Sequence, residues 1–245
     1  MNPLAYDEMN EVERDHWWYV GRRAILSEII SDMNFESNCK ILEIGCGTGG
    51  NLDMLSSHGN LIAVDMSSDA VKMAKAKNIK NTDIYLGSLP NEMPDFAYKF
   101  DLICMFDVLE HIEMHQEALK NIKSYLKDDG RVILTVPAYQ WLYGKHDEHL
   151  HHKRRYYKSE LVDLVISAGY KVKQITHFNT LLFPVALVVR LYEKYIQREK
   201  KAEKLKVKNQ LTNKILSQIF KSELVAIKKI SLPYGLSLMC VIGKI

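Results

Sequence analysis

A glycine-rich stretch following a short apolar segment carries the first recognisable chemistry in this sequence. Residues 41–50 read ILEIGCGTGG, and Gly45, Gly47 and Gly50 have the spacing GxGxxG. Glycines let a backbone turn sharply and approach a ligand closely, and the amides that open the next helix favour an anionic group. Asp65 lies twenty residues beyond Gly45, where a carboxylate can hold ribose hydroxyls. This spacing predicts a nucleotide-like ligand.

Glu43 distinguishes between two cofactors for this loop. The spacing GxGxxG is also that of nicotinamide dinucleotide enzymes, which are therefore one candidate class. Glu43, however, ends the segment just before the glycines, where a carboxylate would repel a pyrophosphate but suit a ligand with an ammonium and a sulfonium. The chain also ends in a predicted strand after a long insertion, and residues 106–111 read FDVLEH. These features favour a sulfonium cofactor.

A second cluster of reactive side chains follows the predicted strand at 131–136. Four histidines fall within residues 146–152, and Arg154 and Arg155 follow them. In an acceptor site the arginines would grip a phosphate or carboxylate, and His146 or His149 would serve as general base. His111 is another candidate base. The histidines also suggest a metal, but they show no sharp ligand spacing, so we predict no metal site.

Short apolar segments alternate with helical patterns and so define the elements that position these residues. Strands are predicted at 41–44, 61–64, 83–86, 100–106, 131–136, 170–177 and 237–242. Helices are predicted at 11–34, 51–57, 68–76, from 116 to near 130, and 159–169. Repeated β-then-α order predicts a parallel sheet with helices on both faces and right-handed crossovers. A helical insertion precedes the last strand.

The composition predicts one α/β domain with an elaboration. The chain has 245 residues, 47% of them hydrophobic, and a net charge of +3. Cys39, Cys104 and Cys240 lie in or at the start of apolar runs, which predicts core packing in a reducing compartment. The N-terminus lacks the pattern of a secretory signal. No apolar run is long enough to span a membrane, and Leu181–Val189 is expected to be buried or interfacial.

Charge is concentrated near the C-terminal end. Residues 190–229 contain twelve Lys or Arg and four Glu, a net of +8. The stretch is either a solvated helical face or a surface that meets anionic lipid. An apolar segment at 178–191 followed by a basic helix suits a lipid-linked acceptor at a membrane surface. We therefore expect a cytoplasmic protein with membrane association left open. Nucleic acid is disfavoured because the basic stretch lacks interleaved aromatics.

Four motifs together resemble class I S-adenosylmethionine-dependent methyltransferases of the small-molecule type. Residues 43–49, EIGCGTG, look like motif I of that family, and Asp65 matches the acid that ends its second strand. Residues 107–111, DVLEH, and 126–134, LKDDGRVIL, are similar to the segments after its fourth strand and into its fifth. The resemblance covers about residues 38–177 and the final strand. It implies a Rossmann-like seven-stranded sheet, mostly parallel, with an antiparallel last strand and a helical insertion before it.

The resemblance also implies the site residues. The glycine loop would cradle the methionine of S-adenosylmethionine, Glu43 would hold its amino group, Asp65 its ribose, and Met66 with Leu89 its adenine. The family often has an acid after the third strand where this chain has Ser88. The cofactor-binding residues are expected to be Glu43, Gly45, Cys46, Gly47, Thr48, Gly49, Asn51, Asp65, Met66, Ser88, Leu89, Phe106, Asp107 and Val108. The substrate-binding residues are expected to be Trp18, Arg22, Tyr139, His149, Arg154, Arg155 and Tyr156.

The resulting functional prediction is in-line methyl transfer to a small-molecule or lipid-linked acceptor. The alternatives are a nicotinamide-dependent oxidoreductase and a cofactor-binding scaffold without turnover. We expect a single domain over 1–245, divided into an N-terminal helical cap (1–37), a cofactor-binding core (38–177), a helical lid (178–232) and the last strand (233–245).

Overall fold

The computed structural model describes residues 3–195 and 209–245, whose strands form one sheet. The strands are β1 (Lys40–Ile44), β2 (Asn60–Asp65), β3 (Thr82–Leu86), β4 (Phe100–Phe106), β5 (Leu126–Pro137), β6 (Tyr170–Phe178) and β7 (Ser237–Lys244). Their order is β3-β2-β1-β4-β5-β7-β6. Strand β7 is antiparallel to both β5 and β6, and the other neighbours are parallel. The predicted fold class is confirmed.

Six strands therefore end at the same side of the sheet, which we call the carboxyl edge. The helices are α1 (Pro3–Val12), α2 (Trp17–Ser31), α3 (Leu52–Ser56), α4 (Ser68–Ala76), α5 (His115–Tyr125), α6 (Lys145–His149), α7 (Lys158–Ser167), α8 (Phe183–Tyr195), α9 (Gln210–Ser222) and α10 (Leu224–Ile227). Two short 3₁₀ helices, η1 (Leu109–His111) and η2 (Gln140–Leu142), follow β4 and β5 at this edge. Open parallel sheets bind ligands at their carboxyl edge, so it is the first place to look for a site.

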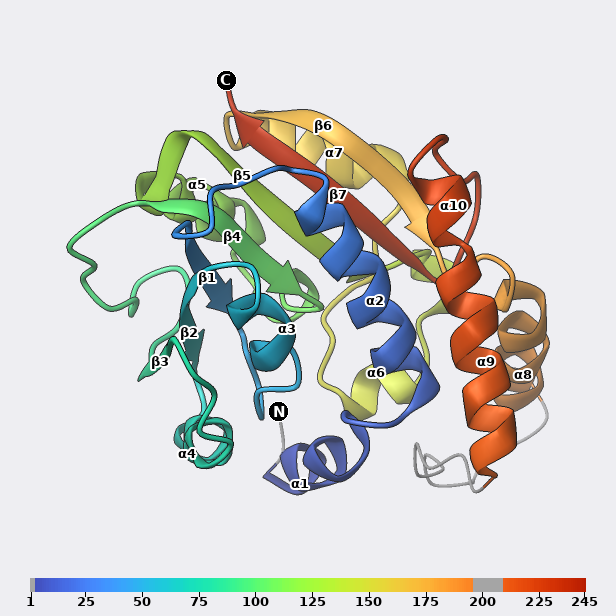
Figure 1. Ribbon diagram of the computed structural model, residues 1–245. Helices are drawn as coiled ribbons and strands as arrows, with labels where there is room; N and C mark the ends of the chain where they lie inside the picture. Colours follow the sequence, from blue (N-terminus) through green and yellow to red (C-terminus); the bar gives the residue numbers. More distant parts are fainter. Residues whose placement is uncertain (1–2, 196–208) are drawn as a thin grey trace.

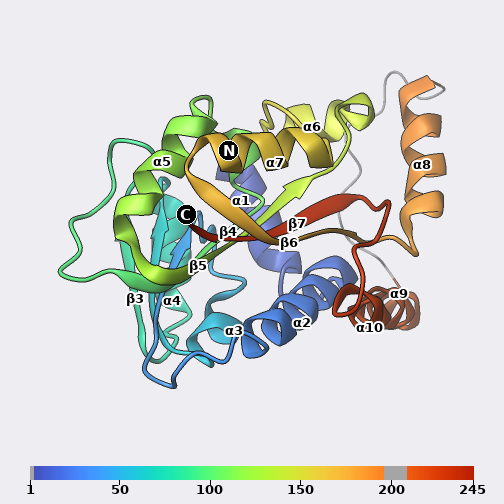
Figure 2. The same cartoon turned by 90° about the horizontal axis from the view of Figure 1, so that it is seen from above.

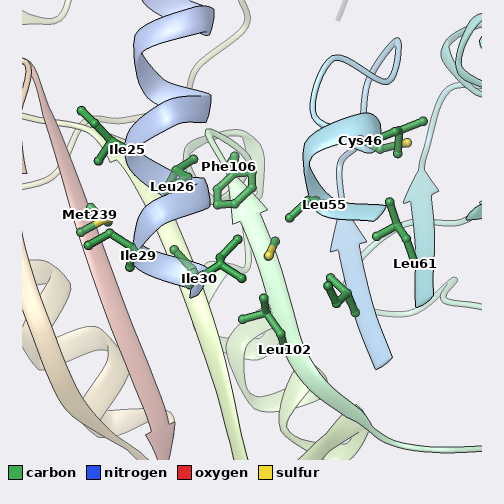
Figure 3. Close-up of a cluster of buried hydrophobic side chains, with 14 of the residues drawn as sticks. Ile25, Leu26, Ile29, Ile30, Cys46, Leu55, Leu61, Leu102, Phe106 and Met239 are labelled. Carbon is green, nitrogen blue, oxygen red and sulfur yellow. The ribbon is translucent and has the colours of Figure 1, made fainter. Parts of the chain in front are cut away.

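Helices cover both faces of the sheet (Figures 1 and 2). Helices α2, α3 and α9 lie on one face, and α5 and α7 lie on the other. Figure 3 shows Ile25 and Ile29 of α2 close to Met239 of β7, with Phe106 and Leu102 of β4 beside them. Each fully buried side chain of this size contributes about 1.5–3 kcal/mol to folding. This packing holds α2 rigidly over the sheet.

The predicted element ends hold at most positions, with two clear differences. The single helix predicted at 11–34 is divided, because α1 ends at Val12 and α2 begins at Trp17. Ser67 accepts a hydrogen bond from the amide of Ala70 and so caps α4, as its position predicts. Helix α5, by contrast, ends at Tyr125, and β5 begins at Leu126, although the sequence predicted helix to near Gly130. Leu126 is fully buried and pairs with Phe100 of β4. Pairing with the neighbouring strand overrides the local helical pattern there.

The predicted helical insertion contains α8, α9 and α10, which lie at the end of the molecule beyond β6 and β7 (Figures 1 and 2). The apolar run at its start is only partly buried, because Leu182 joins the core whereas Val185 and Val188 are 65% and 67% exposed. An interfacial setting for the exposed part stays a prediction. Among the described residues, every helix is too short or too polar to cross a bilayer. The charge-rich stretch 199–208 lies outside the described residues.

Candidate functional site

The glycine loop has the backbone shape that a close ligand approach requires. Gly45, Gly47 and Gly49 have φ angles of 75°, 54° and 93°, a region that side-chain-bearing residues rarely adopt. A Cβ on Gly45 would overlap the side chain of Val108, which follows β4. The loop is therefore packed directly against the segment after β4, and larger residues at these positions would deform it.

Asp65 is the last residue of β2 and lies beside the glycine loop. Its carboxylate links that loop to the segment after β2. Its Oδ2 accepts a hydrogen bond from the amide of Gly47 at 2.8 Å, and its Oδ1 accepts one from the amide of Ser67 at 2.9 Å. Burial raises the pKa of Asp65, while these two hydrogen bonds lower it in part. A carboxylate has about four lone-pair sites, so Asp65 can still accept hydrogen bonds from a ligand.

Glu43 presents a buried acceptor without a partner. Its Oε1 accepts a hydrogen bond from Asn51 Nδ2 at 2.8 Å, while its Oε2 is buried and has no hydrogen-bond partner among the described residues. Burial raises the pKa of this carboxyl to about 7. A buried polar atom normally has a partner, so Oε2 marks a place where a donor such as an ammonium group would fit. The arrangement fits S-adenosylmethionine at its methionine end.

Replacing Glu43 by Gln is expected to stabilise the cofactor-free protein above pH 7. The folded-state pKa of about 7 exceeds that of an unfolded glutamate, so the wild type holds its full stability below the unfolded pKa and loses it as pH rises through the folded one. The neutral glutamine escapes that loss, which amounts to at most about 3 kcal/mol. Urea denaturation at about pH 5 and about pH 8 measures it.

The exposed Glu36→Gln variant is the control and should show no such pH dependence, since Glu36 lies in solvent between α2 and β1. If Glu43→Gln raises the free energy of unfolding equally at both pH values, ionisation of Glu43 does not destabilise the folded protein.

Helix α1 lies over the glycine loop and brings residues that the sequence did not reveal. A Cβ on Gly47 would lie 2.7 Å from Met9 Cε, and Thr48 Oγ1 donates a hydrogen bond to Glu13 Oε1 at 2.7 Å. Glu13 is buried and also pairs with Lys77. Nothing in the sequence around Glu13 distinguishes it from a surface acid, so only the fold could identify this role.

Arg22 of α2 reaches the end of β4. It forms an ion pair with Asp107, and its guanidinium lies over the Trp18 ring at 4.4 Å from the centroid. Trp18 and Arg22 were predicted to bind substrate, and Asp107 was predicted to bind the cofactor. The structure brings these three residues together at the carboxyl edge, so members of the predicted cofactor and acceptor sets are neighbours here.

The residues predicted to hold adenine follow β2 and β3. Met66 is 70% exposed, and Leu89 is partly buried in the loop after β3. Ser88 Oγ donates a hydrogen bond to the Glu92 carboxylate at 3.0 Å. Glu92 thus supplies an acid close to the position where the family's acid is missing, although it lies four residues further along the chain.

The predicted acceptor residues after β5 are largely engaged with protein groups. Arg155 donates from Nε to Asp147 Oδ1 at 2.9 Å and from Nη1 to the Ala138 carbonyl at 3.2 Å. Arg154 donates to the Ile112 carbonyl at 3.1 Å. Tyr139 stacks on His177 at 5.4 Å, and the hydroxyl of Tyr156 donates to the Leu109 carbonyl at 3.3 Å. Their substrate-binding roles stay predictions.

Two of the three candidate bases, His146 and His111, have lowered pKa values. Burial, reinforced by the charge of Arg190, lowers the pKa of His146 to about 3. Burial and neighbouring His152 lower the pKa of His111 to about 4. Such rings accept a proton poorly at neutral pH, so the geometry gives little support to either as a general base. His149 is 48% exposed and lies 4.0 Å from Glu8 of α1.

The sheet order, the glycine loop and the two buried carboxylates together define a class I S-adenosylmethionine-dependent methyltransferase. Residues 19–179 match the family model of the methyltransferase domain, and the chain belongs to that family. This match supports the predicted cofactor, S-adenosylmethionine, over a nicotinamide.

Several proteins that are similar to this chain are described as methyltransferases. The mitochondrial ubiquinone biosynthesis O-methyltransferase of Schizosaccharomyces pombe is 29% identical over 147 residues, covering 53% of each chain. The ubiquinone biosynthesis O-methyltransferase of Rickettsia canadensis is 23% identical over 62% of this chain and 70% of its own. The chain therefore spans about half the length of the first of these relatives. An S-adenosylmethionine-dependent methyltransferase from Clostridium acetobutylicum shares the fold, with a TM-score of 0.60, 14% identity and coverage of 98% and 96%.

Proposed function

We propose that this protein transfers a methyl group from S-adenosylmethionine to an oxygen of a small-molecule or lipid-linked acceptor at the carboxyl edge. The observation that carries the proposal is the unpartnered Oε2 of Glu43 beside a glycine loop that Asp65 holds in place. An oxygen acceptor is suggested by the two relatives described as O-methyltransferases.

Each end of the cofactor has a counterpart among these residues. Glu43 would accept a hydrogen bond from the amino group of the methionine moiety, and the amides of the glycine loop would face its carboxylate. Asp65 would accept hydrogen bonds from the ribose hydroxyls. Met66 and Leu89 would flank the adenine. Together these groups would hold the donor at the carboxyl edge, near Asp107 and the loop after β5.

Methyl transfer needs little from the protein besides positioning. The acceptor oxygen attacks the methyl carbon in line, the sulfur–carbon bond breaks, and its electron pair returns to sulfur, leaving S-adenosylhomocysteine. The acceptor hydroxyl releases its proton to solvent. Correct alignment alone supplies about 7–11 kcal/mol of such a barrier in favourable cases. The partly buried Arg22–Asp107 pair and the Tyr139–His177 stack would be walls for that alignment.

Incubation of the protein with methyl-labelled S-adenosylmethionine and fractionated lipids and metabolites tests the proposal. Label is expected in at least one acceptor fraction, and S-adenosylhomocysteine, but not NAD, should bind in calorimetry. Cofactor binding without label in any fraction would favour the non-catalytic scaffold instead. Binding of NAD in its place would favour the oxidoreductase.

We infer that α8 brings the protein to an anionic membrane surface. Val185, Val188, Val189 and Tyr192 are exposed on this helix, and Leu181 is exposed just before it. The following stretch, 190–229, carries a net charge of +8 by sequence. Apolar side chains beside basic ones are the combination that binds anionic lipid headgroups and the acyl boundary together. Such a surface would give a lipid-linked acceptor access to the carboxyl edge.

The double variant Val185→Asp with Val188→Asp is expected to bind vesicles of anionic phosphatidylglycerol more than tenfold more weakly. Two exposed apolar side chains are lost and two like charges face the lipid. Vesicle flotation measures the bound fraction. The control is Ile166→Asp, which changes an exposed residue of the separate helix α7 and should bind as the wild type does. Equal flotation of all three proteins would disprove the role of α8.

A further inference from the structure

Three side chains from two loops face one another at the carboxyl edge. Glu110 and His111 belong to η1, directly after β4, and His152 lies in the loop after α6. Each offers one ligand atom, and the three atoms lie within 4.8 Å of one another. His152 Nε2 is 3.9 Å from Glu110 Oε1, and the rings of His111 and His152 meet edge to face at 4.7 Å. One carboxylate and two imidazoles therefore converge.

The carboxylate of Glu110 is buried without hydrogen bonds. The residue has no exposed surface, and neither carboxylate oxygen has a hydrogen-bond partner among the described residues. Its backbone is well fixed, because the amide of Lys153 donates to the Glu110 carbonyl at 2.9 Å and ties the two loops together. Buried carboxylates in native proteins are normally hydrogen-bonded, paired or bound to a metal ion. Glu110 lacks hydrogen bonds, and its contact with His152 is long.

Both imidazoles are oriented through their other nitrogen. His152 Nδ1 is 2.8 Å from Asp147 Oδ1, and His111 Nδ1 is 3.3 Å from the His151 carbonyl oxygen. Since both partners are acceptors, the Nδ1 atoms carry the protons and the Nε2 atoms keep their lone pairs. Asp147 is fixed in turn by Arg155. A carboxylate or carbonyl behind the outer nitrogen of a histidine is the usual support of a metal ligand.

We propose that Glu110, His111 and His152 bind a divalent transition-metal ion, with Zn²⁺ as the best fit. Two neutral imidazoles and one carboxylate suit Zn²⁺ and its first-row neighbours, whereas Mg²⁺ and Ca²⁺ prefer oxygen ligands alone. Zinc takes such ligands at about 2.0–2.2 Å, so the three side chains close in slightly around the ion. Three protein ligands leave a fourth position open, as in catalytic zinc sites.

The position of the cluster assigns a role to the open coordination site. This role rests on the proposed function. Glu110 lies three residues after Asp107, at the edge where the donor and the acceptor meet. The fourth position would take an oxygen of the acceptor, and a bound divalent ion lowers the pKa of a coordinated hydroxyl.

The sequence predicted no metal site because the four histidines at 146–152 lack ligand spacing. Only His152 of the four belongs to the cluster. The other two ligands come from the loop after β4, forty residues away in the chain. Adjacency of the two loops at the carboxyl edge creates the site, and sequence spacing carries no trace of it.

Titration of the untagged, chelator-treated protein with Zn²⁺, in competition with a chromophoric chelator, tests the site. One ion should bind per chain, and Glu110→Gln and His152→Ala should each weaken binding about a hundredfold or more. The matched control is His149→Ala, which removes a 48%-exposed histidine of the same run and should leave zinc affinity unchanged. Co²⁺ bound to the unmodified protein should give the visible absorption of a low-coordinate site.

Binding of S-adenosylhomocysteine to the same samples checks that each variant is folded and keeps the two proposals separate. If the cofactor binds but the wild type takes up no Zn²⁺, or if all three variants bind zinc equally, the metal site is wrong and the methyltransferase proposal stands. If zinc binds as expected but no acceptor is methylated, the metal site stands and its role in the reaction fails.

Discussion

Replacing Asp65 by Ala is expected to weaken the binding of S-adenosylhomocysteine more than tenfold. Two effects add in this variant. The ligand loses charge-assisted hydrogen bonds from its ribose, and the amides of Gly47 and Ser67 lose the acceptor that holds the glycine loop. The loss should appear in the dissociation constant measured by isothermal calorimetry, since the ligand then meets a loop that must be ordered on binding.

Asp53→Ala is the matched control, because Asp53 is an exposed acid on α3, immediately after the same loop. It should bind S-adenosylhomocysteine as the wild type does. An Asp65→Ala protein that is folded by circular dichroism and binds with unchanged affinity would rule out the ribose role of this carboxylate.

Replacing Arg155 by Met is expected to lower the free energy of unfolding by about 3–5 kcal/mol, the usual cost of removing one partner of a buried ion pair. Arg155 and Asp147 have side chains that are 4% and 0% exposed. Burial alone would raise the pKa of Asp147, but the hydrogen bond with His152 and the charge of Arg155 hold it well below its usual range. Without Arg155 that charge is left in the interior. Urea denaturation at neutral pH measures the change.

The neighbouring substitution Arg154→Met is the control. Arg154 pairs with Glu113, whose side chain is 73% exposed, so its loss should cost less than about 1 kcal/mol. Arg155 was predicted from the sequence to bind substrate. If Arg155→Met unfolds at the wild-type urea concentration and loses only turnover, that role is correct and the ion pair contributes little.

The cofactor side of the site could be predicted from sequence because its chemistry is local. Glu43, the three glycines and Asp65 lie at the ends of adjacent strands, and their spacing follows from one β–α–β unit. The same logic predicted the sheet, because apolar strand segments alternate with helical patterns. The bounds of α5 and β5 were wrong where strand pairing decided them.

The acceptor side could not be predicted in the same way because its contacts join distant segments. Glu13 meets Thr48, Arg22 meets Asp107, and Glu110 meets His152 only after the chain has folded. Asp107 and Glu110 lie in the DVLEH motif, but nothing in the sequence indicates their partners, and Glu13 carries no sequence signal at all. The prediction that Arg154 and Arg155 grip a phosphate or carboxylate did not anticipate that each already has protein partners.

Helix α1 bears on the rate of turnover. Met9 contacts Gly47, and Tyr6 forms a hydrogen bond with Asp65, so α1 covers the residues proposed to hold the ribose and the methionine moiety. If S-adenosylmethionine occupies the proposed site, we expect donor exchange to need a displacement of α1. Substitutions between α1 and α2 are then expected to change turnover without changing the chemical step.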